Sequence, residues 1–294
     1  MAKLNMVGKG RKAIEMIVDP GSLLENVVDE YRFDPEIGPC VIIGSARIND
    51  QTVTVIGNDA HKVNPRFRVV YAGVIGLEEA YKMAMAVYWT IAADCDKPPA
   101  QKRPLILIVD TPGNAPGKVE EVLGIHKATG AYQLALAEAR KIGHPIVAMI
   151  VGRAISGGFL CHGLQADHIL SLSGDFGTMV HVMPLTSIAR ITKTDIQRIQ
   201  ELSAENPVFA AGVDFFYRLG GIEEIINDVD GMREAILRHI EEIRAIKADG
   251  REDEIGPWSR GTLGAKRGGR ETRPCVIQKM REEFEAVAER YIGI

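Results

Sequence analysis

The residues of this chain best suited to holding a reacting group lie in the segment VGRAISGGFLCHG, residues 151–163. Gly157 and Gly158 have no Cβ, so a ligand atom can approach their backbone closely. An apolar run at 146–151 predicts a strand, and 159–166 has helical character, so the glycines stand where a helix begins. The first N–H groups of a helix lack intrahelical partners and suit a carboxylate, a phosphate or a developing oxyanion. A Gly-Gly pair alone is more often a turn that binds nothing.

Ser156 and His181 are the side chains near these glycines that could move a proton. Ser156 lies in an Ala-x-Ser-x-Gly context, and His181 falls in a short strand expected at 177–182. Imidazole has an unperturbed pKa of about 6.5, which suits proton delivery near neutral pH. We expect the two side chains to face each other at the mouth of a site, with the serine orienting the ring or the ligand. In the alternative interpretation His181 packs inertly beside Met179 and Met183.

A second glycine-containing turn precedes the first along the chain. The sequence TPGNAPGKVEE, residues 111–121, follows a buried strand expected at 105–109 and Asp110. Open α/β sheets bind ligands beyond the carboxyl ends of neighbouring strands. We therefore expect this turn, with Gly113, Asn114 and Gly117, to lie beside the Gly157-Gly158 turn and to contribute to binding.

Hydrophobic periodicity and turn residues predict an α/β protein around these turns. The other strands are expected at 40–46, 52–57, 168–172 and 222–226. Helices are expected at 11–18, 77–92, 117–141, 194–202, 209–219, 232–246 and 280–291. A basic loop at 58–72 is either a solvated surface or a contact for cofactor phosphates. The predicted regions are an N-terminal arm at 1–35, a main domain at 36–248, and a Gly/Arg-rich loop with a C-terminal helix at 249–294.

Composition excludes several classes of function. The chain has 294 residues and a net charge of −4, which gives no electrostatic case for nucleic acid or a membrane surface, and no run reaches the length of a membrane span. The four cysteines lack disulfide or zinc spacing and suggest a cytoplasmic protein. The histidines also lack metal-site spacing, so no metal is expected. His239 is interpreted as structural, whereas His162 fits a structural or a functional role equally well.

Several motifs together resemble the second half of the acyl-CoA carboxyltransferase fold, within the crotonase superfamily. They are Asp110-Thr111-Pro112-Gly113, Pro116-Gly117, Glu120-Glu121, Gly124-Ile125, Gly130-Ala131, Ala137-Glu138-Ala139 and Arg153-Ala154-x-x-Gly157. The resemblance covers roughly 40–230. It implies a crotonase/Clp-like superhelix of repeated strand-strand-helix units, present here as one carboxyltransferase half-domain.

Within that superfamily, the run 178–183, TMVHVM, and the absence of a first half-domain resemble the gamma subunit of biotin-independent malonate decarboxylase. The resemblance implies that a malonyl thioester on the phosphopantetheine-type arm of an acyl carrier protein is decarboxylated at an interface with a homologous beta subunit. It also implies an acyl carrier protein transferase subunit as a partner and no cofactor bound by this chain itself.

The same resemblance assigns roles to residues. It implies that peptide N–H groups of Gly157 and Gly158 surround the enolate oxygen, with Ser156 and His181 as the other catalytic candidates. Gly113, Asn114, Gly117 and Phe159 are the implied substrate-binding residues. Carboxyltransferases often have Gly-Gly-Ala-Tyr where this chain has Ser156-Gly157-Gly158-Phe159, so the position of the donor pair is open by one residue.

Three alternatives stay open at this point. A carboxyltransferase subunit acting on carboxybiotin has the same fold and nearly the same turns. A Clp-like serine hydrolase would use Ser156 and His181, although no third triad member is clear in the sequence. The last alternative is an inactive partner subunit.

Overall fold

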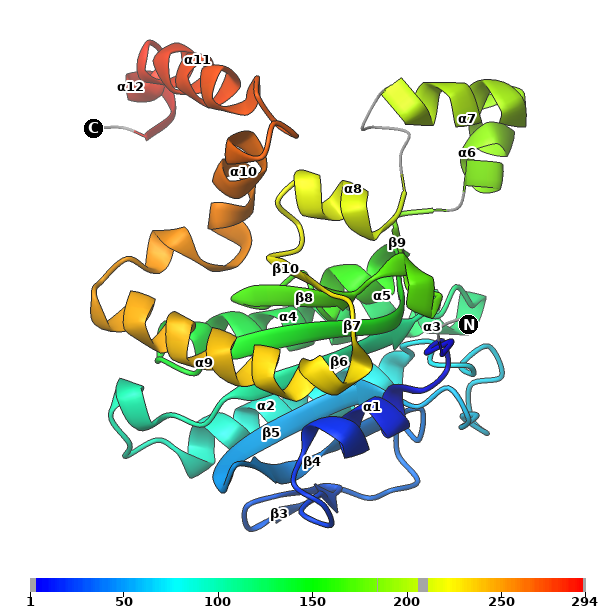
Figure 1. Ribbon diagram of the computed structural model, residues 1–294, viewed down its shortest axis with the longest axis vertical. Helices are drawn as coiled ribbons and strands as arrows, with labels where there is room; N and C mark the ends of the chain where they lie inside the picture. The colour runs from blue at the N-terminus through cyan, green and yellow to red at the C-terminus, as the bar shows by residue number, and fades with distance from the viewer. Residues whose placement is uncertain (1–3, 184, 206–210, 293–294) are drawn as a thin grey trace.

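A mixed β-sheet forms the centre of the computed structural model, which describes residues 4–183, 185–205 and 211–292 (Figure 1). From one edge to the other, the strands run β1 (Leu24–Glu25), β4 (Val41–Ile48), β5 (Gln51–Asn58), β6 (Leu105–Thr111), β7 (Ile146–Ile155), β8 (His168–Leu172) and β10 (Glu224–Ile226). The strands from β5 to β10 pair in parallel, whereas β4 pairs with β5 as an antiparallel hairpin. A short strand, β9 (Met179–His181), pairs with the end of β7. The α/β class is as predicted.

The alternation of side chains along β6 explains the layers. Leu105, Leu107 and Val109 join the apolar core on one side of the sheet, and Ile106 and Ile108 join the core on the other. The first core is covered by α2 (Leu77–Ala93) and α4 (Ile125–Lys141), and the second by α1 (Gly10–Ile17) and α9 (Met232–Ala248) (Figure 1). A strand buried on both faces reads as a continuous apolar run, which is why β6 was recognisable in the sequence.

The remaining described helices lie mostly around one end of the sheet. They are α3 (Lys118–Leu123), α5 (Ser156–Cys161), α6 (Leu185–Thr192), α7 (Ile196–Glu205), α8 (Val213–Arg218), α10 (Gly256–Lys266), α11 (Arg273–Glu285) and α12 (Ala288–Ile292). A small hairpin of β2 (Val27–Val28) and β3 (Tyr31–Arg32) precedes the main sheet. Figure 1 shows α6 with α7, and α11 with α12, projecting from the body as two separate arms. Part of the helix expected at 209–219 lies outside the described residues.

The single helix expected over 117–141 is wrong, because the segment forms two helices. The helix is interrupted at Gly124, whose left-handed backbone, with a φ of 96°, ends α3 before α4 begins. The buried stripe belongs to α4, where Ile125, Tyr132 and Leu136 are buried, whereas Val122 of α3 is exposed. A glycine is the residue for which this backbone conformation costs least.

The Gly/Arg-rich loop expected in the first part of 249–294 is also corrected, because that part contains α10. Gly264 in this segment is required for close packing rather than for flexibility. A Cβ on Gly264 would collide with the carbonyl of Leu219, and a Cβ on Gly220 would collide with the backbone of α10 at Arg260 and Gly264. Composition alone suggested a loop because glycine lowers helix propensity. Tertiary contact between α10 and the end of α8 overrides that preference.

The strand predicted at 146–151 continues to Ile155, and α5 begins at Ser156 rather than Phe159. Strand β6 likewise runs through Asp110 to Thr111. Thr111 is the register partner of Ala154, so the two strands end side by side. The two glycine-containing turns are therefore neighbours at the carboxyl ends of adjacent parallel strands, as predicted.

Candidate functional site

The turn after β6 and the start of α5 pack directly against each other. A Cβ on Gly158 would lie 2.8 Å from both the carbonyl carbon of Gly113 and Oγ1 of Thr111. A Cβ on Gly157 would collide with the side-chain amide of Asn114. The structure thus brings together Gly113, Asn114, Gly157 and Gly158. At both glycines of α5, neighbouring atoms occupy the space that a side chain would take: a side chain at Gly157, and a backbone turn and a hydroxyl at Gly158.

A buried ion pair locks the two strands beneath these turns. Arg153 Nε donates to Asp110 Oδ1 at 2.9 Å, and the Arg153 backbone N–H donates to the same oxygen at 3.0 Å. Arg153 also donates to the carbonyl of Ala72 at 2.8 Å, and Asp110 accepts from the N–H of Gly8 at 2.5 Å. Asp110 and Arg153, one from each of the two sequence motifs, therefore hold together the strand ends that carry the site. Their spacing in the sequence did not indicate this role.

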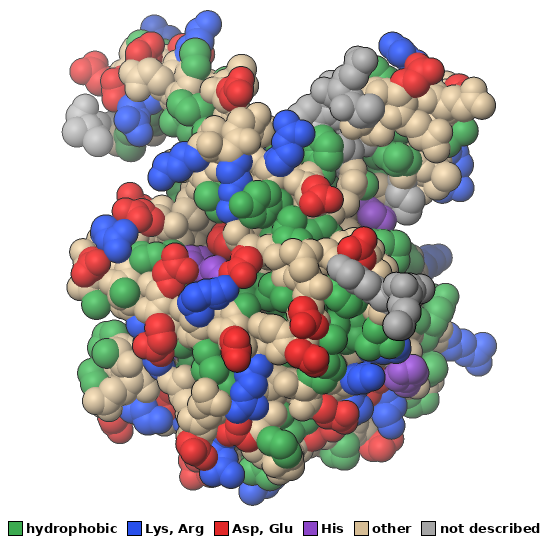
Figure 2. Space-filling model, viewed as in Figure 1, with side chains coloured by type: hydrophobic (Ala, Val, Ile, Leu, Met, Phe, Trp, Pro, Cys, Tyr) green, Lys and Arg blue, Asp and Glu red, His purple; other side chains and the backbone are tan. Residues whose placement is uncertain are grey.

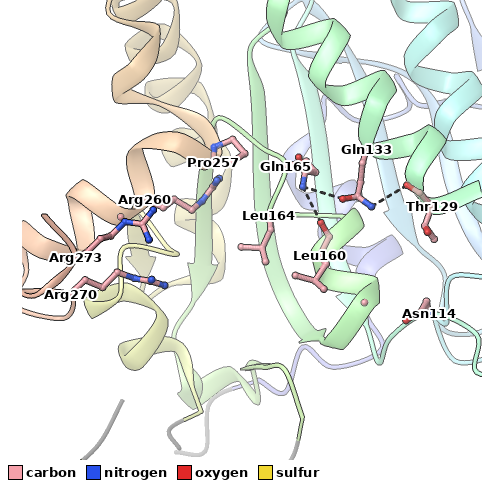
Figure 3. Close-up of a pocket in the computed structure, with 12 residues that line it drawn as sticks. Asn114, Thr129, Gln133, Leu160, Leu164, Gln165, Pro257, Arg260, Arg270 and Arg273 are labelled. Carbon is pink, nitrogen blue, oxygen red and sulfur yellow. Dashed lines mark hydrogen bonds between the residues drawn. The ribbon is translucent and has the colours of Figure 1, made fainter. Parts of the chain in front are cut away.

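A cavity of about 540 Å³ opens beside these turns (Figure 3). Figure 3 shows residues of α4, α5 and the turn after β6 on one side and arginines of the C-terminal segment on the other. Its lining comprises Asn114, Thr129, Gln133, Gly157, Leu160, Leu164, Gln165, Pro257, Arg260, Gly261, Arg270 and Arg273. Of the residues singled out in the sequence, Asn114 and Gly157 line it.

Arg260 is a feature of this cavity that sequence reasoning missed. Its side chain is buried, and Nη2 donates to the carbonyl of Ala166 at 2.6 Å. Within the described part of the chain, Nε and Nη1 have no hydrogen-bond partner. Burial lowers the pKa of Arg260, and burial together with neighbouring Arg273 lowers the pKa of Arg270. Buried donors without partners are costly, so this wall of the cavity favours an anion.

Ser156 begins α5 in a left-handed backbone conformation with φ of 52°. Such a conformation is uncommon for a residue with a side chain, and it occurs at functional turns between strand and helix. A Cβ on Gly113 would lie 3.7 Å from Cβ of Ser156, so the serine belongs to the same pair of turns. Its backbone strain is a structural sign that the sequence could not supply.

His181 lies one register step from Ser156, because its partner in the β7–β9 pairing is Ile155. Its Nδ1 is buried without a hydrogen-bond partner among the described residues, and none of the described hydrogen bonds joins it to Ser156. Burial lowers the pKa of His181. The ring lines a second cavity, of about 880 Å³, which shares Arg270 and Arg273 with the first. The predicted pairing of Ser156 with His181 stays a prediction.

Two of the residues proposed for substrate binding make packing contacts in the structure, and their binding roles stay predictions. Phe159 is buried in the core, where its ring meets Phe216 edge-on with centroids 6.1 Å apart. Gly117 is the N-cap of α3, facing Glu120. Neither residue lines the cavity that holds Asn114 and Gly157.

His162 is structural. It is fully buried, its Nδ1 lies 2.9 Å from the hydroxyl of Tyr132, and its Nε2 lies 3.1 Å from the carbonyl oxygen of Ile108. Burial lowers the pKa of His162 to about 4, so the ring is neutral at pH 7 and joins two core elements. In the basic loop, Arg66 is held by Glu78 at 2.6 Å, which gives that residue a structural partner.

A histidine cluster that sequence spacing missed lies elsewhere in the fold. His168, His239 and Glu242 bring three potential ligand atoms within 4.8 Å of one another. His239 is thus buried in the core region as expected, but with a second histidine beside it.

Comparison with known proteins identifies the family. A family model described as malonate decarboxylase gamma subunit matches residues 71–284. The chain belongs to the malonate decarboxylase gamma subunit family. This confirms the family that the sequence motifs indicated, and the chain is therefore a malonate decarboxylase subunit with a carboxyltransferase-like fold.

A curated relative from Malonomonas rubra, malonyl-S-ACP:biotin-protein carboxyltransferase MADD, is 64% identical over 97% of this chain and 98% of its own length. The acetyl-coenzyme A carboxylase carboxyl transferase subunit alpha of Syntrophomonas wolfei is 26% identical over 69% of this chain and 62% of its own length.

Solved structures agree with this assignment. A Pseudomonas malonate decarboxylase hetero-tetramer in complex with coenzyme A contains a chain that is 29% identical to this one, with a TM-score of 0.71 and coverage of 94% of this chain and 100% of that chain. Transcarboxylase 12S, at 21% identity and a TM-score of 0.60 over 80% of this chain and 40% of that chain, shows the fold alone. The predicted carboxyltransferase fold of the crotonase type is confirmed.

Of the helices that the structure describes, none combines the length and hydropathy needed to cross a membrane.

Proposed function

We propose that this gamma subunit cleaves the bond between the carboxylate and the α-carbon of a malonyl thioester, together with a homologous beta subunit. The thioester is carried on the phosphopantetheine-type arm of an acyl carrier protein, which an acyl carrier protein transferase subunit loads. Support comes from the family, from the malonyl-S-ACP named for the Malonomonas relative, and from the coenzyme A in the Pseudomonas hetero-tetramer. In the proposed reaction, this chain itself binds no cofactor.

The observation that carries the proposal is the cavity that places Gly157 and Asn114 opposite Arg260, Arg270 and Arg273. Cleavage leaves the bonding electron pair on the substrate as an enolate, and carbon dioxide departs. Backbone N–H groups at Gly157 and Gly158 would stabilise the enolate oxygen, each donor contributing roughly 3 kcal/mol to lowering the barrier. Protonation of the α-carbon then gives the acetyl thioester.

The arginines suit the phosphate of the carrier arm better than the reacting carboxylate. Charge leaves the carboxylate in the transition state, so a strong ion pair there would stabilise the ground state and slow the reaction. The charge of a phosphate is unchanged during the reaction. We therefore assign the arginines of this wall, Arg260, Arg270 and Arg273, to the arm.

Replacement of Arg260 tests this assignment. In the complex with the beta subunit, we expect Arg260→Gln to raise KM for a malonyl thioester about tenfold or more and to leave kcat nearly unchanged, because uniform binding is lost. Arg260→Lys, which keeps a charge, should recover part of the loss. A fall in kcat with KM unchanged would place the arginine at the reacting carboxylate instead.

Ser156 and His181 are proposed to supply and orient the proton that quenches the enolate. The left-handed backbone of Ser156 and the unpartnered Nδ1 of His181 support this pairing. The same geometry would serve a serine hydrolase. Labelling of Ser156 by a fluorophosphonate would favour that activity, and absence of labelling is expected.

A second candidate function is transfer of the carboxyl group to biotin. The specific observation in its favour is the 64% identity to a malonyl-S-ACP:biotin-protein carboxyltransferase, compared with 29% to the Pseudomonas decarboxylase chain. Both functions share the cleavage step and the enolate, and they differ only in the fate of the carboxyl group.

The experiment that separates them follows that carboxyl group. The complex of this chain with its beta subunit is supplied with a malonyl thioester labelled in the free carboxyl carbon. Release of labelled carbon dioxide without any biotin protein is the result expected for a decarboxylase. Label retained until a biotinylated carrier is added, and then found on that carrier, would establish the carboxyltransferase. No cleavage under either condition would contradict the proposal as a whole.

A further inference from the structure

A cluster of histidine and glutamate side chains lies outside the proposed active site, where α9 crosses the edge of the sheet. His168 is the first residue of β8, and Glu224 is the first residue of β10. His239 and Glu242 lie three positions apart on α9, so they share one face of that helix. Figure 2 shows histidine side chains at the surface next to α9, among acidic and basic side chains.

We propose that His168, His239 and Glu242 form a binding site for a divalent transition-metal ion of the zinc class. The two Nδ1 atoms lie 2.8 Å apart, and Oε2 of Glu242 lies 3.4 Å from Nδ1 of His239 and 4.0 Å from that of His168. With zinc–ligand bonds of about 2.0–2.2 Å, ligand atoms of a tetrahedral site lie about 3.3–3.5 Å apart. One edge of the triangle has that length, and the other two differ from it by about 0.6 Å, which small side-chain movements can supply.

The hydrogen bonding of His239 favours a ligand role for its Nδ1. Nε2 of His239 lies 2.8 Å from Oε2 of Glu224, an acceptor, so Nε2 carries the proton of a neutral ring and Nδ1 presents a lone pair. Glu242 is also an acceptor when ionised. Two groups with lone pairs and a second imidazole nitrogen therefore converge on one point, where a cation satisfies all three.

Glu224 completes the arrangement that metal-bound histidines usually have. A ligating histidine commonly donates its other N–H to a carboxylate, which fixes the tautomer and the ring orientation. Here that carboxylate is itself held by Arg238, whose Nη2 lies 2.8 Å and 2.6 Å from its two oxygens. The supporting residues are thus positioned before any ion binds.

A cavity of about 440 Å³ adjoins the cluster, which leaves room for water or another ligand at the fourth position. Its other lining residues include Asp253, Glu254 and Ser259. Ser259 faces this cavity whereas Arg260, its neighbour on α10, faces the proposed active site. Bound metal would join α9 to β8 behind α10 and would stabilise this end of the molecule.

The test uses the full chain after removal of metals with a chelator. Titration with Zn²⁺ against a chromophoric competitor should give one ion per chain with a Kd of about 1 μM or tighter. Zn²⁺ should also raise the melting temperature, because an ion that binds the folded state stabilises it. Co²⁺ should give the visible absorption of a four-coordinate site.

Variants locate the ion. Glu242→Gln changes a half-exposed side chain, so it should fold normally while losing stoichiometric binding. Glu224→Gln should weaken binding about 10- to 100-fold without removing a ligand. His126→Gln, on the exposed face of α4, is the matched control and should bind as the parent does.

Absence of stoichiometric Zn²⁺ binding would overturn the proposal. Binding that survives in both His168→Gln and Glu242→Gln would overturn it equally, and would leave the two histidines as a hydrogen-bonded pair only.

Discussion

The two central glycines have different neighbours, and these decide what each position tolerates. Gly157 faces the movable side chain of Asn114, whereas Gly158 faces the backbone of Gly113 and the hydroxyl of Thr111. A side chain can rotate away from an added methyl group, but a packed backbone turn cannot. Substitution of Gly157 therefore tests its part in catalysis, whereas substitution of Gly158 tests packing.

We expect Gly157→Ala to reduce turnover by the complex about 100-fold or more, because the methyl group displaces Asn114 and obstructs approach to the N–H. The melting temperature should stay close to that of the parent. Gly158→Ala should instead destabilise the fold by about 1–3 kcal/mol through overpacking. Urea unfolding of both variants, alongside rates, checks this. Full activity in Gly157→Ala would remove its N–H from the oxyanion site.

The pH dependence of turnover tests His181. Its pKa is lowered by burial below the ordinary value, so the ring is mostly neutral at pH 7. If the imidazolium delivers the proton to the enolate, turnover should rise as the pH falls from 8 toward that pKa. His181→Gln should be slower and should lose the rise. A variant that keeps the parent's pH profile would exclude the histidine from proton delivery.

At the scale of the elements, glycines set the boundaries on which the site depends. Gly124 divides α3 from α4 through its left-handed backbone, and this break lets α3 turn away while α4 packs along the sheet. Gly264 lets α10 approach the end of α8 and so places Arg260 at the cavity. The position of α10, and therefore of Arg260 beside the cavity, depends on these close backbone contacts.

Gly124 and Gly130 form a matched pair for testing the helix break. Gly124→Ala should destabilise the chain by about 1 kcal/mol, because alanine is strained at a φ of 96°. Gly130 lies inside α4, and no atom of the described residues beyond the helix backbone and the adjacent residues lies within 4 Å of the position that a Cβ would take, so Gly130→Ala should stabilise the chain by about 0.5–1 kcal/mol. Chemical denaturation of both variants measures the two changes, and equal effects would contradict a special role for Gly124.

At the scale of the whole molecule, the two cavities that share Arg270 and Arg273 lie where the end of the sheet meets the C-terminal helices. The larger one is bordered by Ile188 of α6, Phe216 of α8 and Met280 of α11, and Figure 2 shows hydrophobic side chains in the hollow between the two projecting arms. Val276, Met280 and Phe284 of α11 are each at least half exposed. Exposed apolar surface of this kind is typical of a protein that works against a partner.

We expect the purified chain alone to decarboxylate malonyl thioesters at least about 100-fold more slowly than its complex with the beta subunit, since positioning by both halves contributes several kcal/mol. Decarboxylation rates measured before and after adding the beta subunit check this. An unrelated folded protein added in place of the beta subunit is the control. Equal rates would show that one subunit holds a complete site.

The sequence by itself determined the features that arise from local backbone chemistry. Continuous apolar runs specified strands buried on both faces, and the glycine turns at 111–121 and 151–163 indicated where two neighbouring strands end. These signals are local because side-chain periodicity and glycine's freedom act within a few residues. The same motifs were sufficient to indicate the family.

Only the tertiary structure decided which distant side chains meet. Arg260 reaches the cavity of Gly157 because α10 packs on α8, and Phe159 turns into the core rather than toward the cavity. His168 and His239 touch although they are 71 positions apart. Such contacts follow from how helices and strands pack, a property of the whole chain that no local spacing encodes.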